Sequence, residues 1–144
     1  MVTTKVEPMS QPTTSKILYV DDDSDDCYFL GLSLSEAGTK ADLICAGNGE
    51  EAIKYLNSVV SADLPSLIIL DLNMPKLDGR QTLNYIKQQP HLAKIPVVIL
   101  STSENKTDKE ACALLGATSY FKKPYHFEEY KDIINNFIPF LAVS

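Results

Sequence analysis

Short runs of almost wholly apolar residues constrain the fold of this 144-residue chain more than any other feature. Residues 66–70 read SLIIL and residues 95–100 read IPVVIL. Runs of this length are typical of strands buried on both faces, as in parallel sheets that helices cover. Residues 17–20 (ILYV) have the same character, and residues 41–46 (ADLICA) and 118–122 (TSYFK) are weaker strand candidates. The sequence therefore predicts five short strands.

Segments with a helical repeat of apolar residues separate these runs. The first helix is expected to begin at Ser24 and to end before Gly38. Its predicted buried face is Cys27, Leu30, Leu34 and Ala37. Two further helices are expected to begin at Asn48 and Asp78. The fourth helix is expected to bury Ala111, Leu114 and Leu115. The fifth is expected to bury Phe127, Tyr130, Ile134 and Phe137. Five strands alternating with five helices predict an α/β fold with a doubly wound, five-stranded parallel sheet.

Composition and charge exclude several classes of protein. Hydrophobic residues make up 44% of the chain and charged residues 22%, which is ordinary for one globular domain. The formal net charge is −6 and Lys and Arg form no cluster, so nucleic acid is not an expected partner. No apolar run approaches the roughly 20 residues that span a bilayer, so no membrane insertion is expected.

The two ends of the chain differ in character. Residues 1–15 are rich in Thr, Ser and Pro and lack the apolar core of a secretory signal. They are expected to form a flexible tail, and the protein is expected to stay in the cytoplasm. Residues 137–144 (FIPFLAVS) are apolar, and they are expected either to pack on the domain or to form a patch for a partner or a homodimer.

The three cysteines, Cys27, Cys45 and Cys112, are far apart and lie in apolar surroundings. Paired spacings such as CxxC, which a zinc site would favour, are absent from the sequence. We expect three buried free thiols and no disulfide.

Acidic residues gather where the first strand ends. Residues 20–26 read VDDDSDD, and two carboxylates at about 4 Å repel by about 4 kcal/mol near a protein surface. The carboxyl ends of parallel strands lie at one edge of the sheet, where ligands bind in open α/β folds. Asp21 and Asp22 should therefore meet Asp71, which follows the run 66–70. Carboxylates without histidine or thiol suit Mg²⁺, which prefers oxygen ligands.

The same edge should receive hydroxyl and amine groups from the last two strands. Ser101 and Thr102 end the fourth strand, and Lys122 and Lys123 end the fifth. Because side chains alternate along a strand, these two lysines should point in opposite directions, so one of them should face the acids. A divalent cation and an ammonium group on either side of a carboxylate are suited to hold a phosphoryl group on that carboxylate.

Four stretches together resemble the response-regulator receiver domain of two-component signalling. They are VDDD (20–23), LDLNMPKLDG (70–79), PVVILST (96–102) and KP (123–124). The resemblance covers residues 16 to about 137 and implies a flavodoxin-like strand order of 2-1-3-4-5, with residues 16–144 as the receiver domain. The sequences DGR and STS, without an output domain, also resemble stand-alone regulators related to those of cyanobacterial phytochromes.

The resemblance implies a role for each acidic position. Asp71 matches the phospho-acceptor. Asp22 matches the direct Mg²⁺ ligand, and Asp21 matches an acidic ligand that acts through water. The third protein contact to the metal would be the backbone carbonyl of Asn73.

The resemblance also implies roles for residues on the other side of Asp71. Ser101 matches the hydroxyl position, and Lys123 matches the lysine, with Lys122 as the alternative. Tyr120 matches a switch aromatic, although a plain strand aromatic is the alternative. The two positions that tune the lifetime of the phosphate in this family are Asn73 and Ser103.

The function that the resemblance implies is that of a single-domain response regulator in a two-component system or phosphorelay. Asp71 would take a phosphoryl group in line from a phosphohistidine on a sensor histidine kinase or phosphotransfer protein, with Mg²⁺ bridging the oxygens. The protein would not be an enzyme beyond catalysing its own phosphorylation and dephosphorylation. Phosphorylation would draw Ser101 and Tyr120 inward and change the contact with a downstream target protein.

The rest of the acidic run has a simpler interpretation. Ser24 is expected to cap the first helix, Asp25 and Asp26 to favour its positive end, and Asp23 to face solvent. A calcium-binding loop is excluded, because Asp26 would take the glycine position and Leu32 the position of the bidentate glutamate.

Two other functions compete with this one. A phosphatase of the haloacid dehalogenase kind would use Asp21 and Asp23, but the threonine that normally follows is absent from the sequence here. The second alternative is a protein-interaction module with an inactive site. The presence of Asp22, Asp71 and Lys123 argues against it.

Overall fold

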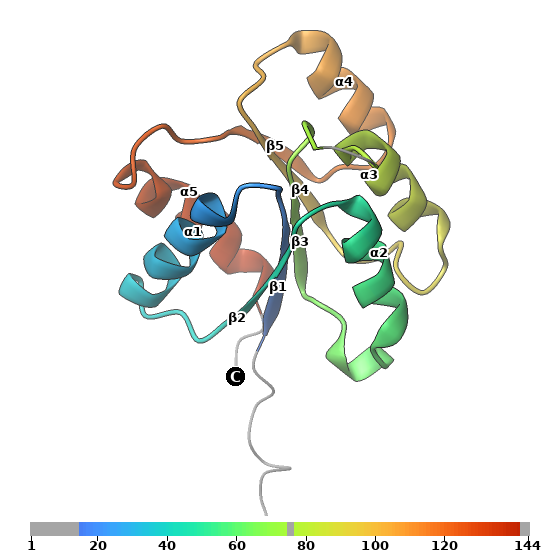
Figure 1. Ribbon diagram of the computed structural model, residues 1–144, viewed down its shortest axis with the longest axis horizontal. Coiled ribbons are helices and arrows are strands. Elements are labelled where there is room, and N and C mark those ends of the chain that lie inside the picture. The colour runs from blue at the N-terminus through green and yellow to red at the C-terminus, as the bar shows by residue number, and fades with distance from the viewer. Residues whose placement is uncertain (1–14, 75–76, 142–144) are drawn as a thin grey trace, which may run out of the picture.

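Strands and helices alternate along the chain, as the apolar runs predict (Figure 1). The computed structural model describes residues 15–74 and 77–141. The strands are β1 (Lys16–Val20), β2 (Asp42–Ala46), β3 (Leu67–Leu70), β4 (Val97–Ser101) and β5 (Ser119–Lys122). The helices are α1 (Ser24–Glu36), α2 (Gly49–Ser58), α3 (Gly79–Gln88), α4 (Lys106–Leu114) and α5 (Glu129–Phe137). Two short 3-10 turns are η3 (Ser61–Asp63) and η4 (Ile138–Phe140).

The five strands form one parallel sheet in the order β2-β1-β3-β4-β5. This order confirms the doubly wound, flavodoxin-like fold. Helices α1 and α5 cover one face of the sheet, and α2, α3 and α4 cover the other (Figure 1). The chain reverses its direction of travel across the sheet between β1 and β3. The carboxyl ends of β1 and β3 therefore mark the place where ligands bind in folds of this kind.

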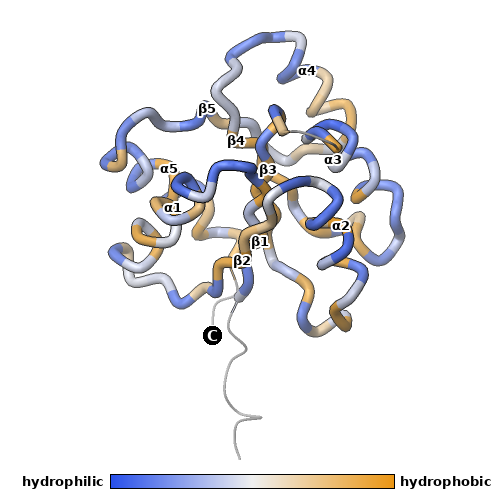
Figure 2. Tube along the Cα trace, in the orientation of Figure 1, coloured by the Kyte–Doolittle hydropathy of each residue, from blue (hydrophilic) through white to orange (hydrophobic). Residues whose placement is uncertain are grey.

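The sheet has a separate core on each face. Along β1, Leu18 and Val20 pack with α2, α3 and α4, whereas Ile17 and Tyr19 pack with α1 and α5. Figure 2 shows apolar strands at the centre and hydrophilic residues on the outer faces of the helices. Because both faces of the central strands are covered, β1, β3 and β4 are apolar except at Lys16 and Ser101, which lie at strand ends. None of the helices in the described ranges has the length and hydropathy needed to cross a bilayer.

Side-chain caps start α1, α2 and α3. Asn48 and Asp78 cap α2 and α3, as predicted. The prediction for α1 is wrong by one position, because its cap is Asp23, whose carboxylate accepts a hydrogen bond from the Asp25 amide at 2.9 Å. Ser24 is instead the first helical residue. Asp23 is exposed as expected, and its negative charge suits the positive end of the helix.

The predicted buried face of α4 is wrong at Leu114, which is 89% exposed. Cys112 is fully buried in its place. Leu115 follows the end of the helix and packs against the same core as Cys112. Leu115 keeps helical dihedrals and its amide donates to the Ala111 carbonyl at 3.1 Å, so it lies on the same helix face as Cys112, three residues earlier, whereas Leu114 faces water.

The prediction of three buried free thiols is also wrong. Cys27 of α1 and Cys45 of β2 form a disulfide, with their Cα atoms 6.4 Å apart. Cys27 is buried, whereas Cys45 is exposed. Cys112 alone is a free, buried thiol. The pair spans 18 residues, a spacing that belongs to no short motif, so only the packing of α1 beside β2 reveals it.

The apolar segment at the end of the chain packs on the domain as far as it is described. Phe137 and Leu141 are buried in the core beneath α1 and α5, and Phe140 packs against it. Ile138 is 41% exposed. The predicted tail, apart from Ser15, lies outside the described residues, and so do residues 142–144.

Candidate functional site

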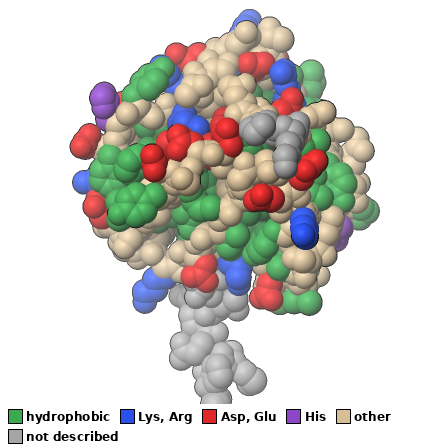
Figure 3. Space-filling view, in the orientation of Figure 1, with side chains coloured by type: hydrophobic (Ala, Val, Ile, Leu, Met, Phe, Trp, Pro, Cys, Tyr) green, Lys and Arg blue, Asp and Glu red, His purple; other side chains and the backbone are tan. Residues whose placement is uncertain are grey.

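Three carboxylates meet at the carboxyl ends of β1 and β3. Asp21 and Asp22 follow β1, and Asp71 follows β3. The Asp71 amide donates to the Val20 carbonyl at 2.9 Å, which continues the strand pairing and sets the two strand ends side by side. One oxygen from each of the three carboxylates lies within 4.8 Å of the others. Figure 3 shows acidic side chains gathered on this face, beside a basic one.

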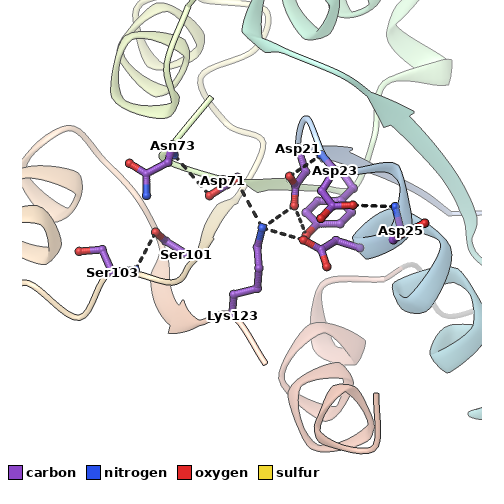
Figure 4. A network of polar contacts seen from close by, with 10 residues as sticks. Asp21, Asp23, Asp25, Asp71, Asn73, Ser101, Ser103 and Lys123 are labelled. Atoms are coloured by element: carbon purple, nitrogen blue, oxygen red, sulfur yellow. Dashed lines mark hydrogen bonds and ion pairs between the residues drawn. The ribbon is translucent and has the colours of Figure 1, made fainter. Parts of the chain in front are cut away.

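The ammonium group of Lys123 lies among these acids (Figure 4). Its Nζ is 2.7 Å from Asp21 Oδ2 and 3.4 Å from Asp71 Oδ2. Lys123 follows β5, whose last residue pairs with Ser101 of β4, so the sheet register brings it to the same edge. Lys122 points elsewhere, because its Nζ lies 3.0 Å from Glu104 and 4.8 Å from the centre of the Tyr125 ring. Strand alternation thus leaves Lys123 as the lysine at the acidic cluster.

The electrostatics of Asp21 and Asp71 differ although the two side chains are neighbours. Burial raises the pKa of Asp71 to about 6; Lys123 opposes this rise and the charge of Asp21 adds to it. Burial also acts to raise the pKa of Asp21, but hydrogen bonds from Lys123, the Asp23 amide and Tyr19 outweigh it and lower that pKa. Burial disfavours the charged form of Lys123, yet the surrounding carboxylates raise its pKa. The site therefore holds a charged lysine, an ionised Asp21 and a carboxylate that readily takes a proton.

Two residues that the sequence interpretation treated as structural contact this cluster. The Tyr19 hydroxyl, which is fully buried, donates to Asp21 Oδ2 at 2.7 Å. Asp26, in the first turn of α1, accepts a hydrogen bond from Lys123 Nζ at 2.9 Å. The prediction that Asp26 only favours the helix start is therefore incomplete. Helix periodicity gave no sign of this contact, because the partner lies 97 residues away in the sequence.

Hydroxyl groups lie on the other side of Asp71 (Figure 4). Ser101 is fully buried, and its Oγ accepts a hydrogen bond from the Ser103 amide at 3.2 Å. The Ser103 hydroxyl donates to Asp108 of α4 at 2.8 Å. The Tyr120 hydroxyl donates to the Ser103 carbonyl at 2.8 Å. One loop between β4 and α4 thus connects Ser101, Ser103 and Tyr120.

The described backbone at residues 71–74 and 77–79 lies close to the acceptor position. The Asn73 amide donates to Asp71 Oδ1 at 3.3 Å, and the Asn73 side chain is exposed. The Gly79 amide donates to the Leu72 carbonyl at 3.1 Å. A Cβ at position 79 would overlap the Asp71 carbonyl oxygen, so glycine permits α3 to begin this close to the site. This close approach explains the glycine at position 79.

The donor set fits a hard divalent cation. All three clustered side chains offer carboxylate oxygens, the ligands that Mg²⁺ and Mn²⁺ prefer. Asp22 is exposed, whereas Asp21 and Asp71 are buried. A cation here would have solvent on the side of Asp22, which agrees with the preference of Mg²⁺ for retaining several waters.

A family model described as the response regulator receiver domain matches residues 17–135. The chain belongs to this receiver family. Over 116 residues it is 36% identical to the response regulator Rcp1 of Synechocystis sp. (strain ATCC 27184 / PCC 6803 / Kazusa), a match that covers 78% of this chain and 79% of Rcp1. The receiver domain is thus similar to a regulator of comparable length.

Solved structures agree with this assignment of the receiver domain. The phosphorylated cyanobacterial phytochrome response regulator RcpA superposes with a TM-score of 0.81 at 32% identity, covering 91% of this chain and all of RcpA. The Mn²⁺-bound form of the response regulator Rcp1 superposes with a TM-score of 0.78 at 32% identity, covering 90% of this chain and 99% of that one. The likeness to cyanobacterial phytochrome regulators, which the sequence motifs indicated, is confirmed.

Proposed function

We propose that this receiver domain accepts a phosphoryl group on Asp71 and signals by contact with another protein. The observation that carries the proposal is the meeting of Asp21, Asp22 and Asp71 with Lys123 at the carboxyl ends of the sheet. The relatives named as phosphorylated RcpA and Mn²⁺-bound Rcp1 support it, since these names report a phosphoryl group and a divalent cation in similar chains.

Asp71 acts as the nucleophile. One of its carboxylate oxygens attacks the phosphorus of a phosphohistidine in line, and the histidine nitrogen leaves. The ammonium group of Lys123, at 3.4 Å from Asp71, is near enough to bind an oxygen of the incoming phosphoryl group after a small shift. The Ser101 hydroxyl accepts from the Ser103 amide and still has its own proton to donate to another phosphoryl oxygen.

Asp21, Asp22 and Asp71 are the side chains that would hold Mg²⁺, with Asp22 binding directly and Asp21 through water. The backbone carbonyl of Asn73 would be the third protein contact to the metal. When bound, Mg²⁺ supplies positive charge that offsets the carboxylates and the oxygens of the phosphoryl group. The side chains of Asn73 and Ser103 would set the lifetime of the phosphate.

The signal leaves the site through the loop between β4 and α4. When Ser101 turns its hydroxyl towards the phosphoryl group, the Ser103 amide that it accepts from moves with it. Tyr120 follows, because its hydroxyl donates to the Ser103 carbonyl. The surface made by α4, β5 and α5 then changes, which is a shift between two existing states.

The partners we propose are a sensor histidine kinase or phosphotransfer protein in the cytoplasm, and a downstream target protein. The chain would catalyse only its own phosphorylation and dephosphorylation. Residues 1–15 would be a tail and residues 16–144 the receiver domain. The packing of Phe137 and Leu141 on the domain does not favour a homodimer through the C-terminal segment, and sedimentation with and without a phosphoryl mimic tests that point.

Incubation with Mg²⁺ and acetyl phosphate, followed by intact-mass measurement, tests the proposal. We expect the mass of one added phosphoryl group, no addition in the Asp71→Asn variant, and no addition in EDTA. Phosphorylation that survives Asp71→Asn would refute the assignment of the acceptor.

The rival phosphatase function finds less support in the geometry. In that function Asp23 would face Asp21 across a substrate, but its carboxylate caps α1 and is exposed. Turnover of p-nitrophenyl phosphate, measured with Mg²⁺, distinguishes the two functions. We expect none, and turnover that depends on Asp21 and Asp23 would favour the phosphatase instead.

A further inference from the structure

Two cysteines approach each other at the rim of the acidic site. Cys27 lies in the first turns of α1, and Cys45 lies one residue before the end of β2. Their Cα atoms are 6.4 Å apart, within the range of about 4.4–6.8 Å that a disulfide spans. The third cysteine, Cys112, is buried in the core on the opposite face of the sheet and cannot exchange with this pair.

The pair is accessible to reagents in solution. Cys45 is exposed, and both cysteines line a pocket of about 420 Å³. Asp21 and Asp22 line the same pocket, so the sulfur atoms share one hollow with two of the proposed metal ligands. An accessible disulfide can be reduced by thiol exchange, unlike one sealed in a core.

Each cysteine is also a direct neighbour of a residue that makes a hydrogen bond in the acidic site. Cys27 directly follows Asp26, which accepts a hydrogen bond from Lys123 at 2.9 Å. Cys45 pairs in the sheet register with Tyr19, whose hydroxyl holds Asp21. A bond between the two sulfurs therefore fixes the first turns of α1, and with them Asp26, against β2.

We propose that Cys27 and Cys45 are a reversible redox site that adjusts this receiver domain. The oxidant is a low-molecular-weight disulfide. One cysteine thiolate attacks its S–S bond, which forms a mixed disulfide and releases one thiol. The other cysteine then attacks the mixed disulfide, which forms the Cys27–Cys45 bond and releases the second thiol. Two electrons and two protons pass from the cysteines to the oxidant, and a dithiol reverses the reaction.

The consequence for signalling rests on the function proposed above. In the oxidised chain α1 cannot draw Asp26 away from Lys123, so Asp26 keeps competing with the phosphoryl group for the ammonium group. Reduction releases α1 and lets Lys123 turn towards Asp71. The oxidised form should therefore be phosphorylated about fivefold more slowly than the reduced form, at the low end of typical couplings between sites.

The experiment uses the full chain in two redox states, prepared with glutathione disulfide or with dithiothreitol. After denaturation, an alkylating reagent should label all three cysteines of the reduced chain and one of the oxidised chain. A non-reduced peptide map should join residues 27 and 45. Phosphorylation by acetyl phosphate and Mg²⁺ is then measured in both states. Cys45→Ser is the test variant, and Cys112→Ala is the control that keeps the pair.

The outcomes separate the two proposals. Glutathione disulfide should slow phosphorylation of the wild type and of Cys112→Ala but leave Cys45→Ser unaffected. Labelling of all three cysteines after oxidation, or a bond between two molecules, would overturn the redox site. Equal phosphorylation of the two redox states would overturn its regulatory effect. If neither state is phosphorylated, the proposed function fails, whereas the alkylation and the peptide map still decide whether Cys27 and Cys45 form a reversible redox pair.

Discussion

The ammonium nitrogen of Lys123 lies 2.9 Å from a carboxylate oxygen of Asp26, in the first turn of α1. This distance is shorter than the 3.4 Å from the same nitrogen to Asp71. In the proposed function a phosphoryl group on Asp71 would need that ammonium group, so Asp26 would compete with it. The competition makes α1 part of the site, although no residue of this helix was assigned a role from the sequence motifs.

Replacing Asp26 by Asn should speed phosphorylation of Asp71, because Lys123 loses one of its three carboxylate partners. We expect an increase of about threefold, less than a full charged hydrogen bond would give, since Asp21 still holds the lysine. The rate is measured with acetyl phosphate and Mg²⁺. Asp25→Asn removes the same charge from the exposed neighbour and should change little. A slower Asp26→Asn variant would mean that Asp26 assists the transfer.

Asp71 should make the stability of the folded chain depend on pH. Burial raises its pKa to about 6, above the value of about 4 in the unfolded chain. A raised pKa stabilises the fold below about pH 4, and this stabilisation is lost as the pH rises through about 6. Asp71→Asn should therefore be about 2 kcal/mol more stable than the wild type above pH 6, with the difference vanishing near pH 4.

Urea unfolding in EDTA at pH 4 and pH 7 measures this difference. Asp25→Asn again serves as the charge-matched control and should not become more stable than the wild type at pH 7. Added Mg²⁺ should stabilise the wild type at pH 7 but not Asp71→Asn, because the cation binds the ionised carboxylate. Equal stabilities of wild type and Asp71→Asn at both pH values would contradict the account of this carboxylate.

Replacing Lys123 by Met should destabilise the fold by about 3 kcal/mol at pH 7 in EDTA, because it leaves buried carboxylates without a counter-charge. Lys122→Met removes the same charge from an exposed position and should cost far less. Mg²⁺ should restore part of the stability of Lys123→Met. Denaturant titration gives both values, and similar costs for the two lysines would argue against the different positions described for them.

Replacing Tyr19 by Phe should cost about 1 kcal/mol, the value of one buried hydrogen bond, because the Asp21 carboxylate loses a donor. Tyr28→Phe is the matched control, since Tyr28 is 63% exposed. Equilibrium unfolding of the two variants at pH 7 provides the comparison. A Tyr19→Phe variant as stable as Tyr28→Phe would show that Tyr19 contributes only packing.

The strands and the main site residues could be predicted because they depend on local pattern. Apolar runs located the strands, and the rule that carboxyl ends share one edge brought Asp21, Asp71 and Lys123 together. The strand order came from the resemblance of the motifs to a known family. The choice of Lys123 over Lys122 came from the resemblance, in which the lysine directly precedes a proline. Strand alternation required only that the two lysines point in opposite directions, and the structure agrees.

The features that were missed depend on contacts between distant residues. Asp26 suits a helix start, and nothing in its local sequence marks the hydrogen bond to Lys123. Cys27 and Cys45 meet only because α1 packs beside β2. Leu114 was assigned to the buried face of α4, but that face is formed by Cys112 and Leu115, and Leu114 points to water. Periodicity identifies the elements, whereas these contacts are fixed by how the elements pack.

Locating the phosphoryl group on the intact wild-type chain tests the central claim most directly. After reaction with acetyl phosphate and Mg²⁺, borohydride reduces an aspartyl phosphate to homoserine, and peptide mass mapping identifies the altered residue. The account predicts homoserine at position 71, formed only when Mg²⁺ is present. Modification at Asp21, Asp22 or another residue, with Asp71 unaltered, would contradict it.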